Sequence, residues 1–229
     1  MYGGKYSKVL TVLLVIIIIA VIGLLGYVGY NVYMNHSIQK SASDYVEAFE
    51  GEKETTTIDS SGGGDGEAEN QVGLEDLNIE SSQDTTQTKA KRKVQYKGFD
   101  TVGTIQIPAT NANYPVLAKT TKKSLETSVA VLYPDNAELN QEGNVVIVGH
   151  NYRNGTFFSN NKKLKIGDKI NITDLYGKKI TYIIYNIFEA NQNDTSFYNR
   201  DTNGAKEITL STCTDASNDM RLIIEAKEQ

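Results

Sequence analysis

An uncharged apolar run near the N-terminus constrains this chain most strongly. Residues Val9–Tyr30 contain no charged side chain. In a helix that rises about 1.5 Å per residue, some 20 residues cross a hydrocarbon core of about 30 Å. The run exceeds the roughly 7–15 apolar residues of a cleaved signal peptide, and no small-residue cleavage pattern follows it. The sequence therefore predicts a retained transmembrane helix over residues 9–30.

Basic residues indicate the orientation of this helix. Lys5 and Lys8 precede the apolar run, and the next basic residue is Lys40. The positive-inside rule then places residues 1–8 in the cytoplasm and everything after residue 30 outside the cell membrane. We therefore expect a single-pass protein that contacts membrane lipid through its N-terminal helix.

Residues 31–93 are predicted to form a flexible acidic stalk. Within them, residues 41–80 hold twelve acidic side chains, one lysine and few large apolar residues. Such a segment buries too little apolar surface to offset its chain entropy. Residues 91–229 instead hold 18 basic and 15 acidic side chains, so the net charge of −5 originates in the stalk. The mildly acidic balance of the whole chain argues against a nucleic-acid partner.

Residues 94–229 are predicted to form one mainly β domain. Short apolar or alternating segments, separated by turn residues, are the pattern of strands. We expect strands at 102–107, 113–117, 130–133, 144–148, 168–173, 179–188, 208–212 and 222–226, and a short helix within 122–129. Eight strands with little helix favour a closed or nearly closed β-barrel, with a β-sandwich as the alternative.

Three side chains lie where predicted strands meet loops, which are common places for functional groups. His150 ends the apolar segment NVVIVGH, Cys213 ends ITLSTC, and Arg221 begins RLIIEA. If the last two strands pair as a hairpin, Cys213 and Arg221 emerge at the same rim. Whether the third strand brings His150 to that rim is not given by the sequence.

This combination of residue types suits acyl transfer. A thiolate attacks a carbonyl carbon and forms a thioester. A nearby imidazolium favours the thiolate and later protonates the leaving amine, while a cation stabilises the oxyanion. Spacing alone does not establish this chemistry, because a lone cysteine is more often a small buried apolar residue.

The motifs around these residues resemble those of the sortase family. Thr209–Cys213 (TLSTC) followed by Arg221 resembles the family signature TLxTC…R. Val146–Asn151 (VIVGHN) resembles the strand-end histidine segment of the same family. The order His, Cys, Arg also fits, and the resemblance covers essentially all of residues 95–229.

The resemblance implies an eight-stranded sortase β-barrel and an extracytoplasmic cysteine transpeptidase. Sortases, typical of Gram-positive bacteria, cleave a C-terminal sorting signal of LPxTG type after its threonine. They pass the acyl group to an amine, usually of a peptidoglycan precursor, and thereby anchor surface proteins to the cell wall. By motif match, Cys213 would be the nucleophile and His150 the general acid and base. Arg221 would hold the substrate or stabilise the oxyanion.

The subclass stays open between class D-like and class B-like. TLSTC and GHN look like class B, but residues 190–206 are short and polar and leave little room for the long helix typical of that class. The sequence shows neither a second apolar span nor an aromatic Asp-Pro lid, and we expect on this basis that it is not a pilus-polymerising sortase.

No cofactor is expected. One cysteine and two histidines argue against a structural zinc site, which usually takes four such ligands. Some class A sortases bind calcium between barrel loops, although acidic loop residues are ordinarily just solvated. The acidic residues that lie in suitable predicted loops are Asp135, Glu138, Glu142, Asp194 and Asp201.

Two other functions remain as alternatives. The same acyl-enzyme would serve a thiol peptidase that releases the acyl group to water, and competition by an acceptor amine distinguishes that case. A non-catalytic surface-binding domain on a stalk is the other alternative. That reading conflicts with the presence of all three catalytic residue types at the motif positions.

Overall fold

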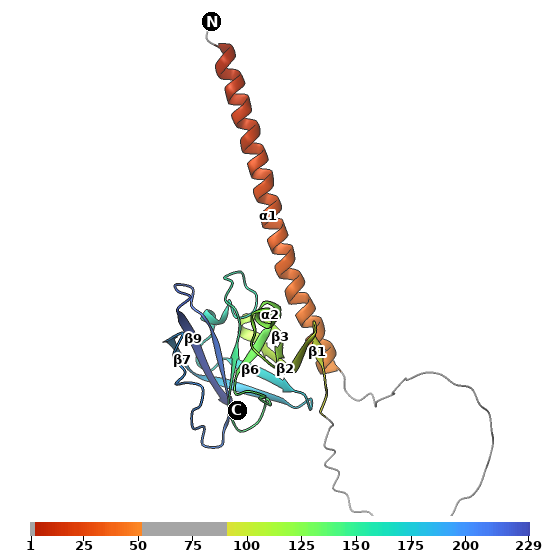
Figure 1. Cartoon of the computed structure of the whole chain (residues 1–229), viewed down its shortest axis with the longest axis vertical. Helices are drawn as coiled ribbons and strands as arrows, with labels where there is room; N and C mark the ends of the chain where they lie inside the picture. Colours follow the sequence, from red (N-terminus) through yellow and green to blue (C-terminus); the bar gives the residue numbers. More distant parts are fainter. Residues whose placement is uncertain (1–2, 52–90) are drawn as a thin grey trace, which may run out of the picture.

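The computed structural model describes residues 3–51 and 91–229 (Figure 1). The elements, in chain order, are α1 (Gly3–Gly51), β1 (Gln95–Tyr96), β2 (Phe99–Ile107), η1 (Pro108–Thr110), β3 (Ala112–Leu117), α2 (Lys122–Thr127), β4 (Val129–Tyr133), β5 (Gly143–Val148), η2 (Asn161–Lys163), β6 (Lys169–Asp174), β7 (Lys179–Asn191), β8 (Lys206–Cys213) and β9 (Met220–Glu228). The eight predicted strands correspond to β2–β9, and the predicted short helix corresponds to α2.

The helix α1 contains the predicted transmembrane segment. The large apolar side chains from Val9 to Tyr33 are exposed. An 18-residue window of the helix has a mean hydropathy of 3.3, and none of it is buried against the rest of the protein. By length and composition, α1 can therefore cross a membrane.

The predicted flexible stalk is wrong for residues 31–51, which continue α1 as a helix. Ala42, Val46 and Phe49 follow the i, i+4, i+7 spacing of one helix face, and all three are buried. The ring of Tyr45 lies edge-on to Tyr96, with 5.1 Å between the centroids. The stalk was predicted from the acidic composition of the segment, which does not reveal that its few apolar residues share one helix face. Of the rest of the predicted stalk, residues 52–90 lie outside the described residues, while residues 91–93 form neither helix nor strand and Arg92 donates to the backbone oxygen of Phe49 at 2.7 Å.

The strands form a closed eight-stranded barrel, as predicted. Neighbouring strands follow the order β2-β3-β4-β5-β8-β9-β7-β6, and a pairing between β6 and β2 closes the ring. The pairs β3–β4 and β5–β8 are parallel, and the other pairs in the ring are antiparallel. Among the described residues, the two-residue strand β1 pairs only with β2, as an edge outside the barrel.

Closure of the barrel depends on Gly103 in β2. Gly103 pairs with Asp174 of β6 and has a φ of 149°, beside a bulge that begins at Thr101. A Cβ atom at this position would lie 2.2 Å from the backbone oxygen of Thr173. Only glycine allows the two strands to approach this closely.

Alternation along β8 divides its side chains between the core and an outward-facing surface. Ile208 and Leu210 belong to the apolar core inside the barrel. Successive strand residues point to opposite faces, so Thr209, Ser211 and Cys213 share the outward face. The strand order therefore gives Cys213 two neighbouring strands on this face, β5 on one side and β9 on the other.

Candidate active site

Cys213 and Arg221 lie directly opposite each other on β8 and β9. Directly opposite residues of an antiparallel pair share a face, with Cβ atoms about 4.5–5.5 Å apart. The predicted hairpin that brings the two side chains to one rim is confirmed. The Arg221 guanidinium donates to the backbone oxygen of Met220 at 3.3 Å and to Oε1 of Gln192 at 3.3 Å. It also donates to the backbone oxygen of Asn218.

His150 lies on the other side of Cys213, immediately beyond β5. The backbone N–H of Gly149 donates to the oxygen of Ser211 at 3.2 Å. The Nδ2 amide of Asn151 donates to the backbone oxygen of Cys213 at 2.9 Å. The residues before and after His150 are thus both bonded to β8. The structure therefore brings all three predicted site residues to one rim, which the sequence alone did not establish.

A tightly packed turn holds the backbone at His150. Thr212 donates its hydroxyl to the oxygen of Gly149 at 2.7 Å, and the N–H of Phe158 donates to the oxygen of His150 at 3.2 Å. A Cβ atom on Gly149 would lie 2.8 Å from side-chain carbons of both Phe158 and Val129. Glycine before the histidine, and threonine before the cysteine, are therefore required by local packing.

The environment of His150 favours the neutral imidazole. Burial lowers the pKa of His150, and the charge of the Glu126 carboxylate raises it by a smaller amount. The imidazole ring packs against Tyr152, with 4.8 Å between the ring centroids. A neutral imidazole is able to accept a proton from a thiol or an amine.

Cys213 is a free, half-buried thiol beside a cavity of about 280 Å³. Phe158 and Leu222 contribute apolar walls, while Glu189 and Lys162 contribute opposite charges. The remaining lining residues are Asn151, Thr212, Thr214, Asp215 and Ala216. The cavity gives a bound acyl group space directly next to the sulfur.

The loop between β8 and β9 is tied to the loop that follows His150. Asp215 accepts from Nδ2 of Asn151 at 2.8 Å and forms an ion pair with Lys162. These two partners lower the pKa of the Asp215 carboxyl. Arg153 donates to the backbone oxygens of Asp215 at 3.1 Å and Thr214 at 3.3 Å. This network was not predicted from the sequence, where its only signal is the asparagine of the GHN segment.

No group of three or more His, Cys, Asp or Glu residues within residues 3–51 and 91–229 is arranged to hold a metal ion. Among the acidic residues considered above for calcium, Glu138 forms an ion pair with Lys91. Asp194 and Asp201 each accept a backbone N–H from their own turn, at 2.8 Å.

The sequence profile of the Sortase domain matches residues 105–229 of the chain. The chain belongs to the sortase family. It is 29% identical over 126 residues to Sortase A of Bacillus anthracis, covering 55% of this chain and 58% of that protein. It is 29% identical over 129 residues to Sortase D of Bacillus subtilis (strain 168), covering 56% of this chain and 62% of that protein. This sortase therefore spans less than two thirds of the length of either relative.

Solved sortase structures share the barrel. A Sortase D5 transpeptidase from Clostridium perfringens superposes with a TM-score of 0.51 at 29% identity, covering 57% of this chain and 79% of that one. A lid mutant of sortase A from Corynebacterium diphtheriae gives a TM-score of 0.51 at 30% identity, covering 56% and 70%. The resemblance inferred from the TLSTC and VIVGHN motifs is confirmed at the level of the family. In this sortase the connection between β7 and β8 contains no helix, as the short polar segment led us to expect.

Proposed function

We propose that this sortase is a membrane-anchored cysteine transpeptidase that uses Cys213, His150 and Arg221. One observation carries the proposal. Cys213 lies on the outward face of β8 between the strand that leads to His150 and the strand that carries Arg221, beside a cavity of suitable size. The clostridial structural relative is described as a transpeptidase, which agrees with this assignment.

The proposed reaction proceeds through a thioester. The Cys213 thiolate attacks the scissile carbonyl carbon, and the Arg221 guanidinium stabilises the oxyanion that develops. The imidazolium of His150 protonates the leaving amine, which departs and leaves the acyl group on sulfur. An acceptor amine then attacks the thioester, gives its proton to the neutral imidazole, and expels the thiolate.

The lowered pKa of His150 suits the second half of this reaction. Burial keeps most of the imidazole neutral at pH 7, ready to accept the proton of the incoming amine. Only a minor fraction of the enzyme then holds the imidazolium that the first half requires. We therefore expect acylation to be slower than deacylation by a good amine.

The proposed substrates are surface proteins with an LPxTG-like C-terminal sorting signal, and the proposed acceptor is an amine of a peptidoglycan precursor. The uncharged run of α1 and the basic residues before it support a single-pass anchor with the barrel outside the cell. Transfer to water would make the same site a thiol peptidase. The subclass, class D-like or class B-like, stays a prediction.

Mass spectrometry of the full chain in lipid nanodiscs tests this function. The chain is mixed with LPxTG-like and LPxTA-like peptides, with and without oligoglycine or a diaminopimelate-type amine. We expect a thioester on Cys213 and an amine-dependent ligated product, both absent in Cys213→Ala. Hydrolysed peptide that does not decrease when amine is added would favour the peptidase. Unchanged substrate processing by Cys213→Ala would refute the mechanism.

A further inference from the structure

Polar contacts between α1 and the barrel follow a definite order along the helix. Closest to the apolar run, Asn154 donates its amide to Oδ1 of Asn35 at 2.9 Å. One turn further on, Gln39 donates to the backbone oxygen of Gly155 at 3.1 Å. Residues 154 and 155 belong to the loop that follows His150. The part of α1 nearest the membrane span therefore contacts the end of the barrel that carries His150, Cys213 and Arg221 (the catalytic rim).

The last turn of α1 contacts a different part of the barrel. The Glu50 carboxylate accepts from the hydroxyl of Thr173 at 2.9 Å and from Nζ of Lys179 at 3.0 Å. Lys179 begins β7, and two residues later the oxygen of Thr181 accepts from the backbone N–H of Gln229 at 3.0 Å. The end of the barrel that carries the C-terminus of the chain thus lies beside the end of α1 that is furthest from the membrane span.

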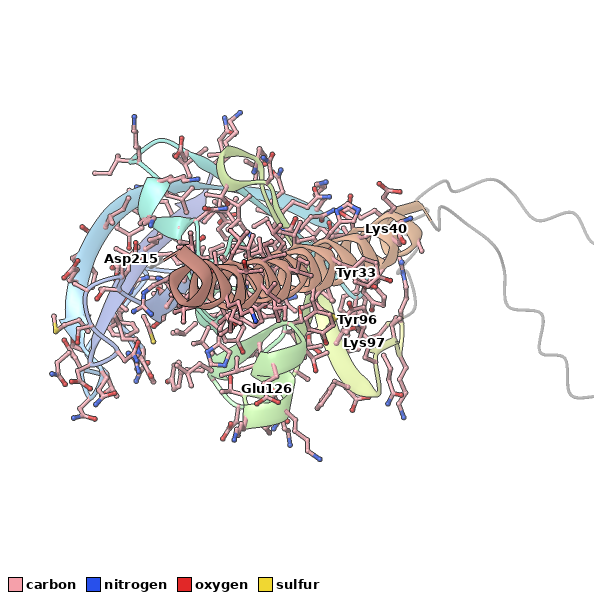
Figure 2. All side chains as sticks on the ribbon, turned by 90° about the horizontal axis from the view of Figure 1, so that it is seen from above. Tyr33, Lys40, Tyr96, Lys97, Glu126 and Asp215 are labelled. Atoms are coloured by element: carbon pink, nitrogen blue, oxygen red, sulfur yellow. The ribbon has the colours of Figure 1, made fainter. Side chains whose placement is uncertain are left out.

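The two sets of contacts give the barrel a direction relative to the membrane. β9 runs from the rim that holds Arg221 toward the C-terminus, which lies at the end of the barrel away from the N-terminus of α1 (Figure 1). Seen from the N-terminal side, α1 projects over the barrel, and Asp215 of the catalytic rim lies on the opposite side of the molecule from Tyr96 (Figure 2). The catalytic rim is therefore the end of the barrel that faces the span.

The continuity of α1 gives the height of this rim. Asn35 is five residues beyond Tyr30, or about 8 Å at 1.5 Å per residue, and Gln39 is about 14 Å beyond it. A bilayer with headgroups extends about 5–8 Å past the hydrocarbon core on each side. The loop after His150 therefore reaches the headgroup level. Tyr152 in that loop and Tyr33 on α1 are 46% and 69% exposed, as suits aromatic residues at a membrane interface.

The height does not depend on the length of residues 52–90. Arg92, just after that segment, donates to the backbone oxygen of Phe49 at 2.7 Å, and its guanidinium lies 4.8 Å from the Phe49 ring centroid. The chain therefore returns to the end of α1 before it enters the barrel. The distance between bilayer and barrel is then fixed by the helix.

We propose that α1 holds the catalytic rim toward the bilayer at a fixed height, so that this sortase acts on peptides tethered to the same membrane. The statement about substrates rests on the proposed transpeptidase function. The statement about orientation does not, because it follows from the contacts of α1 alone.

Depth measurements on the full chain in phosphatidylcholine vesicles test the orientation without catalysis. Cys213→Ala removes the only cysteine, and a single fluorophore is then attached at Ala216→Cys on the catalytic rim or at Lys178→Cys on the β6–β7 turn. Both positions are exposed. A nitroxide on the lipid headgroups should quench the label at 216 at least twofold more than the label at 178. Equal quenching at the two positions, or stronger quenching at 178, would overturn the proposal.

Turnover of a lipid-tethered sorting peptide, compared with the same peptide free in solution, tests the substrate class. Val46→Asp places a charge in the buried contact between α1 and the barrel and should abolish docking. We expect this variant to lose about tenfold in rate on the tethered peptide, because the site is no longer held at the membrane. Its rate on the free peptide should stay unchanged. Glu50→Gln, which keeps the size of the side chain, should give a smaller loss in the same direction.

Deletion of residues 60–69 is the matched control and should leave both rates unchanged. A tethered-peptide rate that falls with this deletion, or that survives Val46→Asp in a chain shown to be undocked by the depth measurement, would refute the role of α1. If neither peptide reacts with the wild-type chain, the proposed function fails, and with it the statement about substrates. The quenching result then still decides the orientation.

Discussion

A buried ion-pair network anchors the connection between β7 and β8 to the outer face of the barrel. Arg200, in this connection, forms an ion pair with Glu207 of β8, and its Nε lies 3.1 Å from Oε1 of Glu225 on β9. The three side chains are only 19%, 10% and 7% exposed. One guanidinium thus compensates two carboxylates that have little access to water.

The same network fixes the backbone of the connection. Asn144 of β5 accepts from Nη2 of Arg200 at 3.2 Å and donates to the backbone oxygens of Phe197 and Tyr198 at 2.9 and 3.0 Å. Tyr198 is close enough to Arg221 for the guanidinium to oppose, in part, the rise in the pKa of Tyr198 that burial causes. The connection therefore forms part of the surroundings of the proposed substrate site.

We predict that Arg200→Met destabilises the fold severely. The substitution keeps most of the apolar stem but leaves Glu207 and Glu225 buried without a counter-charge. Breaking a buried pair in this way typically costs about 3–5 kcal/mol. For a domain of this size, the melting temperature should fall by about 10–20 °C. Release of Tyr198 should also raise KM for the sorting peptide more than it lowers kcat.

Thermal unfolding followed by circular dichroism measures the first effect, and steady-state kinetics below the melting temperature measures the second. The triple variant Arg200→Met, Glu207→Gln, Glu225→Gln should recover most of the lost stability, because the uncompensated charges are gone. Lys206→Met, which breaks the more exposed pair with Glu228, is the matched control and should cost less than about 1 kcal/mol. The reasoning is refuted if Arg200→Met unfolds within 2 °C of the wild type, or if the triple variant is no more stable than the single one.

Three further predictions concern the catalytic rim. Because burial lowers the pKa of His150, the folded chain binds this proton less tightly than the unfolded chain, so stability should fall as the pH drops below about 6.5; an NMR titration of the His150 ring that gives a pKa above 6.5 would contradict this. Gly149→Ala should cost about 1–3 kcal/mol and lower kcat, since the new methyl group overlaps Phe158 and Val129; denaturant unfolding checks the cost, and wild-type stability would show that the turn relaxes freely. Asn151→Ala removes the amide that joins the His150 loop to Cys213 and Asp215, and should lower kcat more than it raises KM; Asn151→Asp, which retains an acceptor but not the donor, should not restore the rate.

Local patterns in the sequence were sufficient for the strands and for the family. Short runs of aliphatic and β-branched residues, such as Asn144–Val148 and Leu222–Ala226, identified strands because successive residues of these strands are buried on both faces of the sheet. The TLSTC and VIVGHN motifs identified the site because threonine, glycine and asparagine at those positions make contacts with the neighbouring backbone that few other side chains can make.

The prediction of a flexible stalk was wrong for residues 31–51 because it used the average composition of the segment and not the side chains on one helix face. Residues 31–51 have the polar, acidic character of a stalk, yet Ala42, Val46 and Phe49 form an apolar face that is meaningful only when a barrel is there to cover it. Whether a segment with a narrow apolar face forms a stable helix depends on the surface that it packs against, because isolated helices gain little stability from propensity alone.

The sequence by itself predicted the apolar segment long enough to cross a membrane and the strands that carry His150, Cys213 and Arg221. Both predictions depend only on neighbouring residues, because an apolar run is compared with the thickness of a membrane and a strand is recognised from successive side chains. Tertiary structure alone decided that β5, β8 and β9 are adjacent, that Arg200 serves two carboxylates from different strands, and that α1 contacts the loop after His150. Each of these depends on contacts between residues far apart in the chain, and the spacing of residues along a strand or helix carries no information about which distant segment it will meet.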